Sequence, residues 1–317
     1  MIDRFGREIN YLRVSVTDKC NLRCRYCMPA EGVCKRSHEE MLREEEMIMA
    51  VRAAASLGIK KVRITGGEPL VKRNIISICR KTARVEGIED LSITTNGVLM
   101  PEMAKDLKAA GVRRVNFSID TINPDKYAHI TRIGKLDDAL AGLEAALSTG
   151  FEKIKINAVL IGGFNDDEIV DLAGLTRRYP VDMRFIEMMP MYDGGDFDES
   201  SFSPASRVLD VLPEAVPVPH DGGVAKLYRL PGAQGNLGLI RPVSAHFCAE
   251  CNRIRLTADG KIKTCLHSAD EYDLKGMNLE EMRSQLRRAI LEKPEWHGVL
   301  SHGHRSQAGR NMNQIGG

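Results

Sequence analysis

The sequence predicts an α/β fold with a barrel-like array of six parallel strands and a smaller C-terminal domain. Three observations predict it. Candidate strands and helices alternate up to about residue 190, one face of almost every strand is polar, and the pattern changes after about Met189. Strands that alternate with helices form parallel βαβ units. Six strands are too few for a full TIM barrel, and a doubly wound open sheet is the alternative that the spacing leaves open.

The six strand candidates are short runs in which apolar and polar residues alternate. They are Leu12–Thr17, Lys61–Thr65, Leu91–Thr95, Arg114–Ile119, Ile154–Ile161 and Met183–Met188. The predicted helices are Glu44–Leu57, Asn74–Val85, Glu102–Ala110, Leu136–Ser148, Asp166–Arg178 and, near the C-terminal end, Leu279–Leu291. The first four are followed by glycines: Gly58, Gly87, Gly111 and Gly150. Glycine supplies the left-handed residue that ends many helices, which supports these boundaries.

One face of the predicted sheet is polar in strand after strand. Successive residues of a strand point to opposite sides, so Arg13 and Ser15 share one face of the first strand, opposite Leu12 and Val14. The helices must cover the apolar face, and the polar face then lines the barrel. The predicted lumen is cationic, with Arg13, Lys61, Arg63, Lys155 and Arg184 along it. In a chain of net charge +2, such a lumen indicates a small polyanionic substrate. The alternative is a polar face turned to solvent.

Three cysteines follow the first strand with the spacing C-x3-C-x2-C: Cys20, Cys24 and Cys27. Thiolates this close suit an Fe–S cluster, and three thiolates leave one iron of a [4Fe–4S] cluster without a protein ligand. An open metal position can bind a substrate or cofactor, as at catalytic metal sites. The alternative is a structural zinc site with a fourth ligand such as His38. Two further cysteines stand apart: Cys79 is expected in the core, and Cys34 has no identified partner.

A second group of three cysteines has the spacing C-x2-C-x13-C: Cys248, Cys251 and Cys265. The residues between them alternate on either side of Asp259-Gly260, a favoured hairpin turn, so a β-hairpin returns the last cysteine to the others. Arg253 and Arg255 project from one face of its first strand. A zinc site is again the alternative, with two candidate fourth ligands: His246 and His267. The polar tail from Ser301 is expected from its composition to be mobile.

Composition limits the compartment and the partners. Hydrophobic residues make up 43% of the chain and charged residues 28%, which is typical of a packed globular protein. The small net charge gives no general attraction to nucleic acid or membranes. The sequence shows neither a signal-peptide pattern nor an apolar run of the ~20 residues that cross a membrane. We therefore expect a cytoplasmic protein, in which clustered cysteines indicate metal binding more than disulfides.

The first cysteine loop, together with Thr65-Gly66-Gly67-Glu68-Pro69 at the end of the second strand, resembles the radical S-adenosylmethionine (SAM) superfamily. The second cysteine group, its two arginines and the terminal Gly316-Gly317 are similar to those of the GTP 3′,8-cyclase family of molybdenum cofactor biosynthesis. Three further segments fit that family: Leu12–Cys20, Thr94–Gly97 and Arg184–Glu187. Lys19 stands where the family more often has arginine. The resemblance covers essentially the whole chain.

This resemblance implies an incomplete (β/α)6 TIM-type barrel over residues 1–230, and a C-terminal Fe–S cluster domain with a Gly-Gly tail over residues 231–317. It implies a lyase that converts GTP to (8S)-3′,8-cyclo-7,8-dihydroguanosine 5′-triphosphate through a 5′-deoxyadenosyl radical, the first step of molybdopterin biosynthesis. The implied cofactors are SAM and two [4Fe–4S] clusters, one on each cysteine group. The implied partners are an electron donor, cyclic pyranopterin monophosphate synthase as the next enzyme, and a second copy in a homodimer.

The resemblance also assigns residues to ligands. The SAM contacts would be Tyr26, Gly66, Gly67, Glu68, Pro69, Ser118 and Met189. The GTP contacts would be Arg13, Arg63, Thr94, Lys155, Arg253 and Arg255, with Lys61 and Arg184 in second rank. Gly316 and Gly317 would reach the active site. Two alternatives are another radical SAM enzyme that modifies a peptide or sugar, and a scaffold protein with two structural metal sites.

Overall fold

The computed structural model describes residues 1–33, 37, 39–191, 197, 199–219, 222–301 and 306–316. Three residues named above lie outside the described residues: Cys34, His38 and Gly317. The described strands are β1 Tyr11–Ser15, β2 Lys61–Thr65, β3 Asp90–Thr95, β4 Arg114–Ser118, β5 Lys153–Leu160, β6 Val181–Glu187, β7 Val216–Pro217, β8 Lys226–Arg229, β9 Leu237–Ile240, β10 Arg253–Leu256, β11 Lys261–Lys263 and β12 Tyr272–Asp273.

The described helices are α1 Glu44–Ser56, α2 Ile75–Ala83, α3 Met100–Ala109, α4 Pro124–Thr131, α5 Leu136–Thr149, α6 Ile169–Arg178, α7 Arg207–Val211, α8 Leu279–Leu291 and α9 Met312–Ile315. All six predicted strands and all six predicted helices are present, with ends that differ by up to three residues. Helix α4 was not predicted. Asn123 caps it by accepting hydrogen bonds from the backbone of Asp125 and Lys126, and Pro124 starts it. Proline is favoured at this first helical position.

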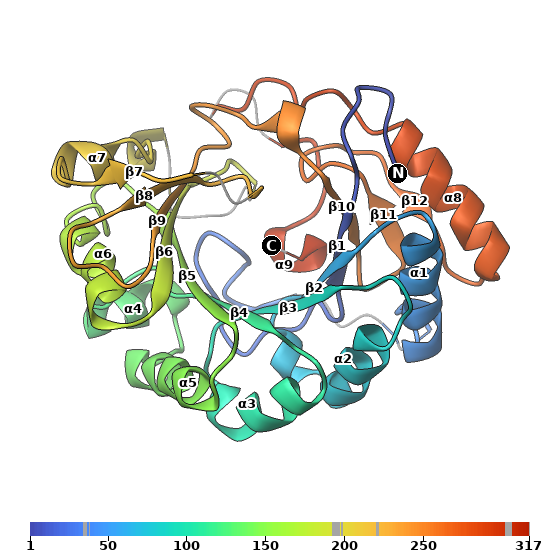
Figure 1. The fold of residues 1–317 in the computed structure, drawn as a ribbon, viewed down its shortest axis with the longest axis horizontal. Helices are drawn as coiled ribbons and strands as arrows, with labels where there is room; N and C mark the ends of the chain where they lie inside the picture. The colour runs from blue at the N-terminus through green and yellow to red at the C-terminus, as the bar shows by residue number, and fades with distance from the viewer. Residues whose placement is uncertain are drawn as a thin grey trace.

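The described strands form one 12-stranded sheet in the order β12-β11-β10-β1-β2-β3-β4-β5-β6-β9-β8-β7. Strands β1 to β6 are parallel neighbours, as predicted. The two outermost strands, β12 and β7, do not pair with each other, so the fold is an incomplete barrel (Figure 1). The predicted hairpin about Asp259-Gly260 is β10 and β11. The sequence did not show that β10 joins β1 in parallel, or that β9 joins β6.

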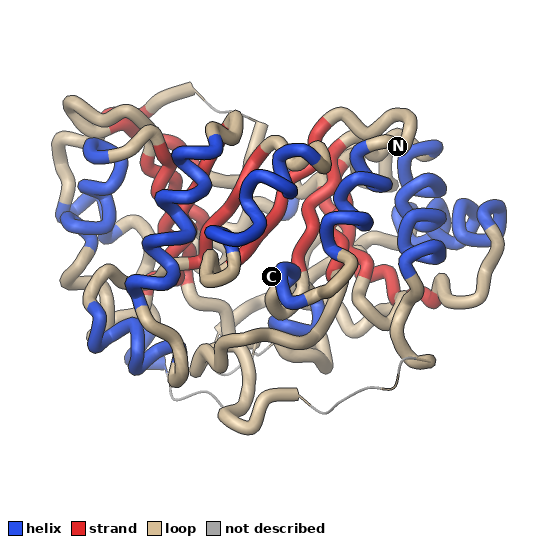
Figure 2. Tube along the Cα trace, turned by 90° about the horizontal axis from the view of Figure 1, so that it is seen from below, coloured by secondary structure: helices blue, strands red, loops and turns tan. Residues whose placement is uncertain are grey.

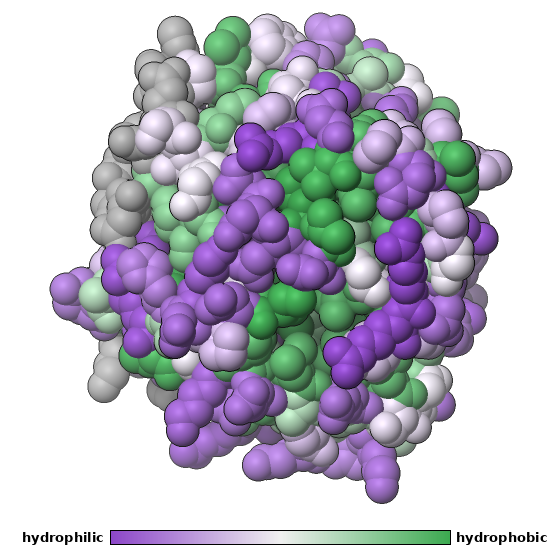
Figure 3. All heavy atoms as spheres, turned by 90° about the vertical axis from the view of Figure 1, so that its left-hand side faces the viewer, coloured by the Kyte–Doolittle hydropathy of each residue, from purple (hydrophilic) through white to green (hydrophobic). Residues whose placement is uncertain are grey.

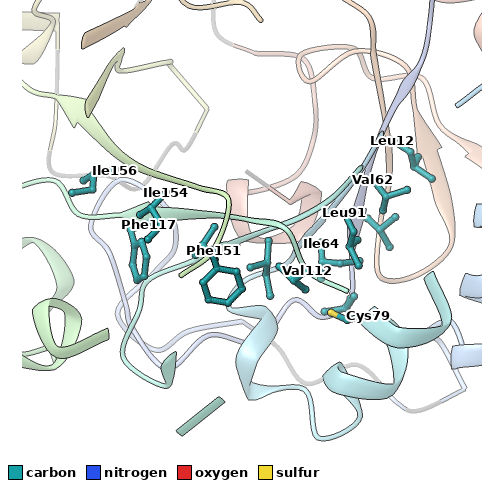
Figure 4. Packing of buried hydrophobic residues seen from close by; sticks show 14 of the residues in the cluster. Leu12, Val62, Ile64, Cys79, Leu91, Val112, Phe117, Phe151, Ile154 and Ile156 are labelled. Atoms are coloured by element: carbon teal, nitrogen blue, oxygen red, sulfur yellow. The ribbon is translucent and has the colours of Figure 1, made fainter. Parts of the chain in front are cut away.

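The apolar face of the sheet packs against the outer helices. In Figure 1 the helices α1, α2, α3, α5 and α6 surround the strands. Leu12, Val62 and Ile64 are buried in this layer, and Figure 4 shows them with their neighbours. Cys79 is fully buried in the same core, as predicted. Since the helices cover the apolar face, the polar face is left to line the interior, which confirms the reasoning from alternation.

The C-terminal segment lies inside the ring of strands. Figure 1 places α9 and the C-terminal end near the centre of the molecule, and Figure 2 shows them from below. Ile315 and Asn313 are buried, so the described part of the tail, residues 306–316, is packed, contrary to the expectation from composition. The expected division of the chain at residue 230 stays a prediction.

The surface beside α6, α7 and β7 mixes hydrophilic and hydrophobic areas (Figure 3). Val170 and Val216 are exposed there. None of the described helices is both long enough and apolar enough to cross a membrane.

Candidate active site

A cavity of about 380 Å³ fills the interior of the incomplete barrel. Most of the predicted site residues line it: Arg13, Cys20, Cys24, Tyr26, Cys27, Lys61, Arg63, Gly66, Gly67, Glu68, Thr94, Ser118, Lys155, Arg184, Met189, Cys248, Cys251, Arg253, Arg255 and Cys265. Pro69 and Gly316 are not on its wall. The fold therefore gathers residues from all the predicted strands and both cysteine groups around one space.

Strand register stacks the basic side chains of the cavity into rows. Arg13 on β1 lies between Arg255 on β10 and Arg63 on β2. Burial, followed by the positive charges of Arg255 and Arg63, holds the pKa of Arg13 well below its usual value. The same causes, burial first and then Arg253, lower the pKa of Arg255 to about 10. Packing like charges this closely is unfavourable without an anion between them.

Several buried polar atoms of residues that line the cavity have no hydrogen-bond partner in the described part of the chain. They are the Nε atoms of Arg13 and Arg63, Oγ1 of Thr94 and the hydroxyl of Tyr11. Buried polar groups are normally hydrogen-bonded. Unpaired donors beside clustered arginines are what a phosphorylated ligand would satisfy.

Tyr11 was not predicted as a site residue. It pairs in register with Arg253 and Lys61, in the row next to that of Arg13. The guanidinium of Arg63 lies 5.5 Å from the centre of its ring. Burial raises the pKa of the Tyr11 hydroxyl, but the positive charges of four arginines, of which Arg63 and Arg13 act most strongly, together outweigh burial, so the net shift is downward. Residues two apart in a strand share a face, so extending the first strand to residue 11 would have placed Tyr11 on the same polar face as Arg13.

The first cysteine group follows the C-terminal end of β1. The backbone N–H of Leu22 donates to Sγ of Cys20 at 3.3 Å, and the N–H of Cys27 donates to the Cys24 carbonyl at 2.9 Å. Burial raises the pKa of Cys20 to about 11 and that of Cys27 to about 12. Buried thiols of this kind become thiolates when a metal supplies the compensating charge. The loop therefore presents three thiols that suit a metal cluster.

The Gly66-Gly67-Glu68 segment packs against the chain that leads into this loop. A Cβ on Gly66 would lie 2.7 Å from the Thr17 carbonyl oxygen, and one on Gly67 would lie 2.7 Å from that of Asp18. The N–H groups of Gly67 and Glu68 donate to the carbonyls of Thr17 and Lys19, each at 2.8 Å. Both glycines are therefore needed for close backbone approach. With these two N–H groups in use, the segment has mainly carbonyl oxygens to offer a ligand.

The buried Glu68 carboxylate fixes the end of β3 rather than reaching the centre of the cavity. It accepts hydrogen bonds from the Thr95 hydroxyl at 2.8 Å and from the Asn96 N–H at 2.7 Å. Burial raises the pKa of Glu68 to about 7 even so. Glu187, at the end of β6, is similarly buried and accepts from the N–H groups of Ala205 and Ser244. Both acids of these sequence motifs thus tie loops to the barrel.

The second cysteine group lies at the opposite end of the lumen. Cys248 and Cys251 precede β10, which runs parallel to β1, whereas Cys20 follows β1. Burial alone would raise the pKa of Cys251, but Lys293 and Arg253 lower it to about 6. Nζ of Lys293, which is buried, donates to the Arg253 carbonyl at 3.1 Å. The surroundings of Cys251 therefore favour its thiolate, whereas burial raises the pKa of Cys248.

These donors suit two Fe–S clusters. Each group offers three thiols to the same cavity, and thiolates are the ligands of Fe–S clusters. The N–H of Leu22 on Cys20 and the charge of Lys293 near Cys251 are outer interactions of the kind that tune such sites. No group of three or more Cys, His, Asp or Glu among the described residues is arranged to hold a single metal ion. Nδ1 of His267, one proposed zinc ligand, lies 3.1 Å from the Ser306 hydroxyl.

The C-terminal segment contacts the end of the site that carries the first cysteine group and an arginine of β10. Nδ2 of Asn313 donates to the Asp18 carbonyl at 2.9 Å, and a hydrogen bond from the Asn313 backbone offsets only part of the rise that burial causes in the pKa of the Cys27 thiol. Nη1 of Arg255 donates to the Gly316 carbonyl at 2.5 Å. Met312 and Asn313 line the cavity. Nothing in the composition of the tail predicts these contacts; the family resemblance predicted only that Gly316 and Gly317 reach the active site, and Gly317 lies outside the described residues.

Asp120 is a further wall residue that was not predicted. Its carboxylate accepts from the Tyr26 hydroxyl at 2.8 Å and from the Val159 N–H at 2.9 Å. Burial raises the pKa of Asp120 to about 6. Asp120 comes two residues after Ser118 and so shares the polar face of the fourth strand. This position in the sequence could have predicted that Asp120 lines the cavity.

Comparison with known proteins agrees with this geometry. The model of the Radical SAM superfamily matches residues 14–176, and that of Molybdenum Cofactor Synthesis C matches residues 181–299. A GTP 3′,8-cyclase of Alkaliphilus oremlandii (strain OhILAs) is 48% identical over 321 residues, with both chains covered completely. One of Pelotomaculum thermopropionicum is 48% identical over 328 residues, again with complete coverage.

Solved structures agree on the fold. Streptococcus suis SuiB matches with a TM-score of 0.67 at 14% identity, covering 94% of this chain and 68% of its own. The structure of SuiB bound to S-adenosylmethionine matches with a TM-score of 0.67, covering 92% of this chain and 67% of its own. At this identity the likeness concerns the fold alone. The match to the Radical SAM model and the full-length relatives show that the chain belongs to the radical SAM superfamily and, within it, to the GTP 3′,8-cyclase family.

Proposed function

We propose that this chain converts GTP to (8S)-3′,8-cyclo-7,8-dihydroguanosine 5′-triphosphate, the first step of molybdenum cofactor biosynthesis. One observation carries the proposal: two groups of three cysteines open onto one arginine-lined cavity from its opposite ends. An enzyme that must hold a radical source and a polyanionic substrate in a shielded space needs this arrangement. Family membership supports the same reaction.

Cys20, Cys24 and Cys27 would hold one [4Fe–4S] cluster, and Cys248, Cys251 and Cys265 the other. When bound, the first cluster would pass one electron from the donor to SAM and so supply a 5′-deoxyadenosyl radical with release of methionine, and the second cluster would hold the guanine base. Hydrogen abstraction from C3′ of the ribose is followed by a bond from C3′ to C8. One electron and one proton then complete the dihydro product. The task of the protein is to hold C3′ and C8 in place and to exclude water.

The basic rows would hold the triphosphate of GTP. Arg13 and Arg63, together with Arg253 and Arg255, surround the cavity where Nε and hydroxyl donors lack partners among the described residues. Planar guanidinium groups bind phosphoryl oxygens through paired hydrogen bonds. Four further residues complete the contacts carried over from the family or from the polar face: Thr94, Lys155 and, in second rank, Lys61 with Arg184. Binding of the polyanion would relieve the repulsion that lowers the pKa of Arg13.

The segment Gly66–Pro69 would hold SAM near the first cluster. Because the N–H groups of Gly67 and Glu68 are already bonded within the protein, the backbone would bind SAM through carbonyl oxygens. Carbonyl oxygens suit the positively charged methionyl ammonium. Tyr26, Ser118 and Met189 line the same cavity and would contact the rest of the cofactor.

Gly316 and Gly317 would act beside the substrate. The Gly316 carbonyl accepts from Arg255, one of the proposed triphosphate ligands, and a Cβ at Gly316 would collide with the side chain of Thr65. The tail thereby links the orientation of Arg255 to the wall of the cavity.

The wider setting belongs to the same proposal. The enzyme would act in the cytoplasm as a homodimer, receive electrons from a one-electron donor and pass its product to cyclic pyranopterin monophosphate synthase. Residues 1–230 would carry the barrel chemistry and residues 231–317 the second cluster and the tail.

Metal content and substrate binding test the proposal together. Two cubane clusters require about eight irons per chain, whereas two zincs without iron would support the scaffold alternative. Replacing Cys24 with serine should abolish 5′-deoxyadenosine formation. Replacing Arg253 or Arg255 with alanine should weaken GTP binding while both clusters still assemble. Unchanged GTP affinity in both single variants would remove the hairpin from the substrate site.

A further inference from the structure

Helix α4 ends against the loop that carries the first three cysteines. Three consecutive carbonyls at this end accept hydrogen bonds, and the donors come from that loop. The His129 carbonyl accepts from Nε of Arg25 at 2.8 Å, that of Ile130 from the Arg25 N–H at 2.9 Å, and that of Thr131 from the Arg23 N–H at 3.1 Å. The last carbonyls of a helix lack partners inside it. Here the cysteine loop provides the missing hydrogen-bond partners, so the end of the helix and the loop hold each other in place.

Arg132, the residue that ends α4, makes hydrogen bonds on both sides of the segment that contains Cys24 and Cys27. Its Nη1 donates to the Arg23 carbonyl at 2.7 Å and to the Met28 carbonyl at 3.2 Å. These two carbonyls directly flank the segment from Cys24 to Cys27. One guanidinium therefore spans the turn that presents two of the three thiols.

The backbone of Arg132 is strained. Its φ is 64° and its ψ is −37°, and it is the one non-glycine residue with positive φ in the part of the chain that the structure describes. A positive φ is normally taken by glycine, and the ψ of Arg132 lies outside the left-handed helical region that other residues sometimes adopt. Strained backbone conformations persist where the surroundings over-determine them, and they cluster at functional sites.

The packing around this junction leaves little freedom. A Cβ at Gly134 would lie 2.8 Å from Cδ2 of Leu22, a residue of the cysteine loop. Oγ1 of Thr131 accepts from the Gly134 N–H at 3.1 Å and donates to the Tyr127 carbonyl at 2.7 Å. The segment after α4 is therefore fitted to the loop by contact as well as by hydrogen bonds.

We propose that Arg132 is a positioning residue for the first Fe–S cluster. Its guanidinium holds the Arg23–Met28 turn in the shape that presents Cys24 and Cys27, and these contacts offset its strained backbone. Glycine would be less strained at this position. The chain has arginine there because the loop needs the guanidinium. This inference rests on the proposed cluster at Cys20, Cys24 and Cys27.

Two substitutions separate the contact from the strain. Arg132→Gly removes the guanidinium and relieves the backbone, so the metal-free protein should be at least as resistant to thermal unfolding as the wild type. Arg132→Met removes the guanidinium and keeps the strain, so it should unfold at a lower temperature. Both should destabilise the first cluster alike. Arg84→Gly is the matched control, because Arg84 also ends a helix, α2, but is exposed and has an ordinary φ of −92°.

The experiment follows the reconstituted full-length protein under anaerobic conditions. It measures iron release to a chelator and the electron paramagnetic resonance change that SAM induces in the first cluster. Loss of an outer-shell partner typically costs 10- to 100-fold in metal affinity. Half of the iron should therefore leave about tenfold faster or more in both Arg132 variants, with the SAM-induced change weakened. The other half should leave as in the wild type, and Arg84→Gly should be unaffected.

Three results separate the possible failures. If the wild type takes up no iron, the proposed function itself fails. If the wild type takes up both clusters and the Arg132 variants release iron at its rate, the positioning role is wrong. If cluster loss follows thermal stability, occurring in Arg132→Met but not in Arg132→Gly, the residue has only a structural role and the inference is overturned.

Discussion

Replacing Arg310 with methionine should release the C-terminal segment from the active site. Arg310 binds two carboxylates of the hairpin region at once. Its Nε and Nη2 lie 2.5 and 2.6 Å from the Glu271 oxygens, and Nη1 and Nη2 each lie 3.0 Å from an Asp259 oxygen. The arginine side chain is 11% exposed, and those of Asp259 and Glu271 are 13% and 22% exposed. Methionine retains most of the aliphatic stem but has none of the donors.

The cost follows from this geometry. Hydrogen bonds to charged groups contribute about 1.5–3 kcal/mol each, but the two carboxylates are partly exposed and can regain water, so we expect a net loss of about 2 kcal/mol. That is a factor of about 30 in the equilibrium between docked and undocked tail. Asn313 and Gly316 would then lose their contacts with Asp18 and Arg255 more often. Turnover should fall more than GTP binding.

Amide hydrogen exchange measures this opening directly. Exchange within residues 306–316 should accelerate about 30-fold at neutral pH, while exchange in β1 to β6 stays unchanged. Arg283→Met is the control, because among the described residues Arg283 makes one interaction, an exposed ion pair with Glu280 at 3.7 Å on α8. Unchanged exchange in the tail of Arg310→Met would refute the view that this double ion pair fastens the segment.

Three further outcomes follow from the same structure. Gly67→Ala should lower the free energy of unfolding by about 1–3 kcal/mol in urea titration, because its Cβ would collide with the Asp18 carbonyl. Gly174→Ala is the control: its new methyl meets open space, so the free energy of unfolding should not fall. Arg13→Met removes a charge that neighbouring arginines repel, so it should raise the stability of the ligand-free protein by about 1 kcal/mol. It should also weaken the stabilisation by GTP, and thermal shifts with and without GTP measure both effects. Lower stability of the variant without GTP would contradict the argument from charge repulsion. Burial raises the pKa of Glu271, but Arg310 and Lys263 outweigh burial, so the net pKa lies below 4.5. Amide exchange in residues 306–316 should therefore be equally protected by docking of the tail at pH 5 and pH 8, and docking should weaken only under stronger acid. Weaker docking already at pH 5 would contradict this.

The barrel was predictable because its strands carry a strong periodic signal. Leu12 and Val14 alternate with Arg13 and Ser15, so both the strand and its two faces follow from four residues. Strand β9 escaped because Leu237–Ile240 is short and follows an irregular segment. The pairing of β10 with β1 joins residues more than two hundred positions apart, and local patterns carry no such information.

The site was predictable where its chemistry is written in residue type and spacing. The two cysteine groups and the lumenal arginines are of this kind. The contributions of Tyr11, Asp120 and Asn313 depend on which neighbours the fold brings to them. Arg132 shows the limit most clearly, because its positive φ and its two carbonyl contacts exist only in three dimensions.

The central claim is that the cavity brings a SAM-derived radical to C3′ of GTP. Anaerobic incubation of the reconstituted protein with SAM, a reductant and GTP deuterated at C3′, followed by mass spectrometry of 5′-deoxyadenosine, tests it most directly. Deuterium should appear in 5′-deoxyadenosine, together with a new guanosine-derived triphosphate. Unlabelled 5′-deoxyadenosine, or none in a protein that holds both clusters, would contradict the claim.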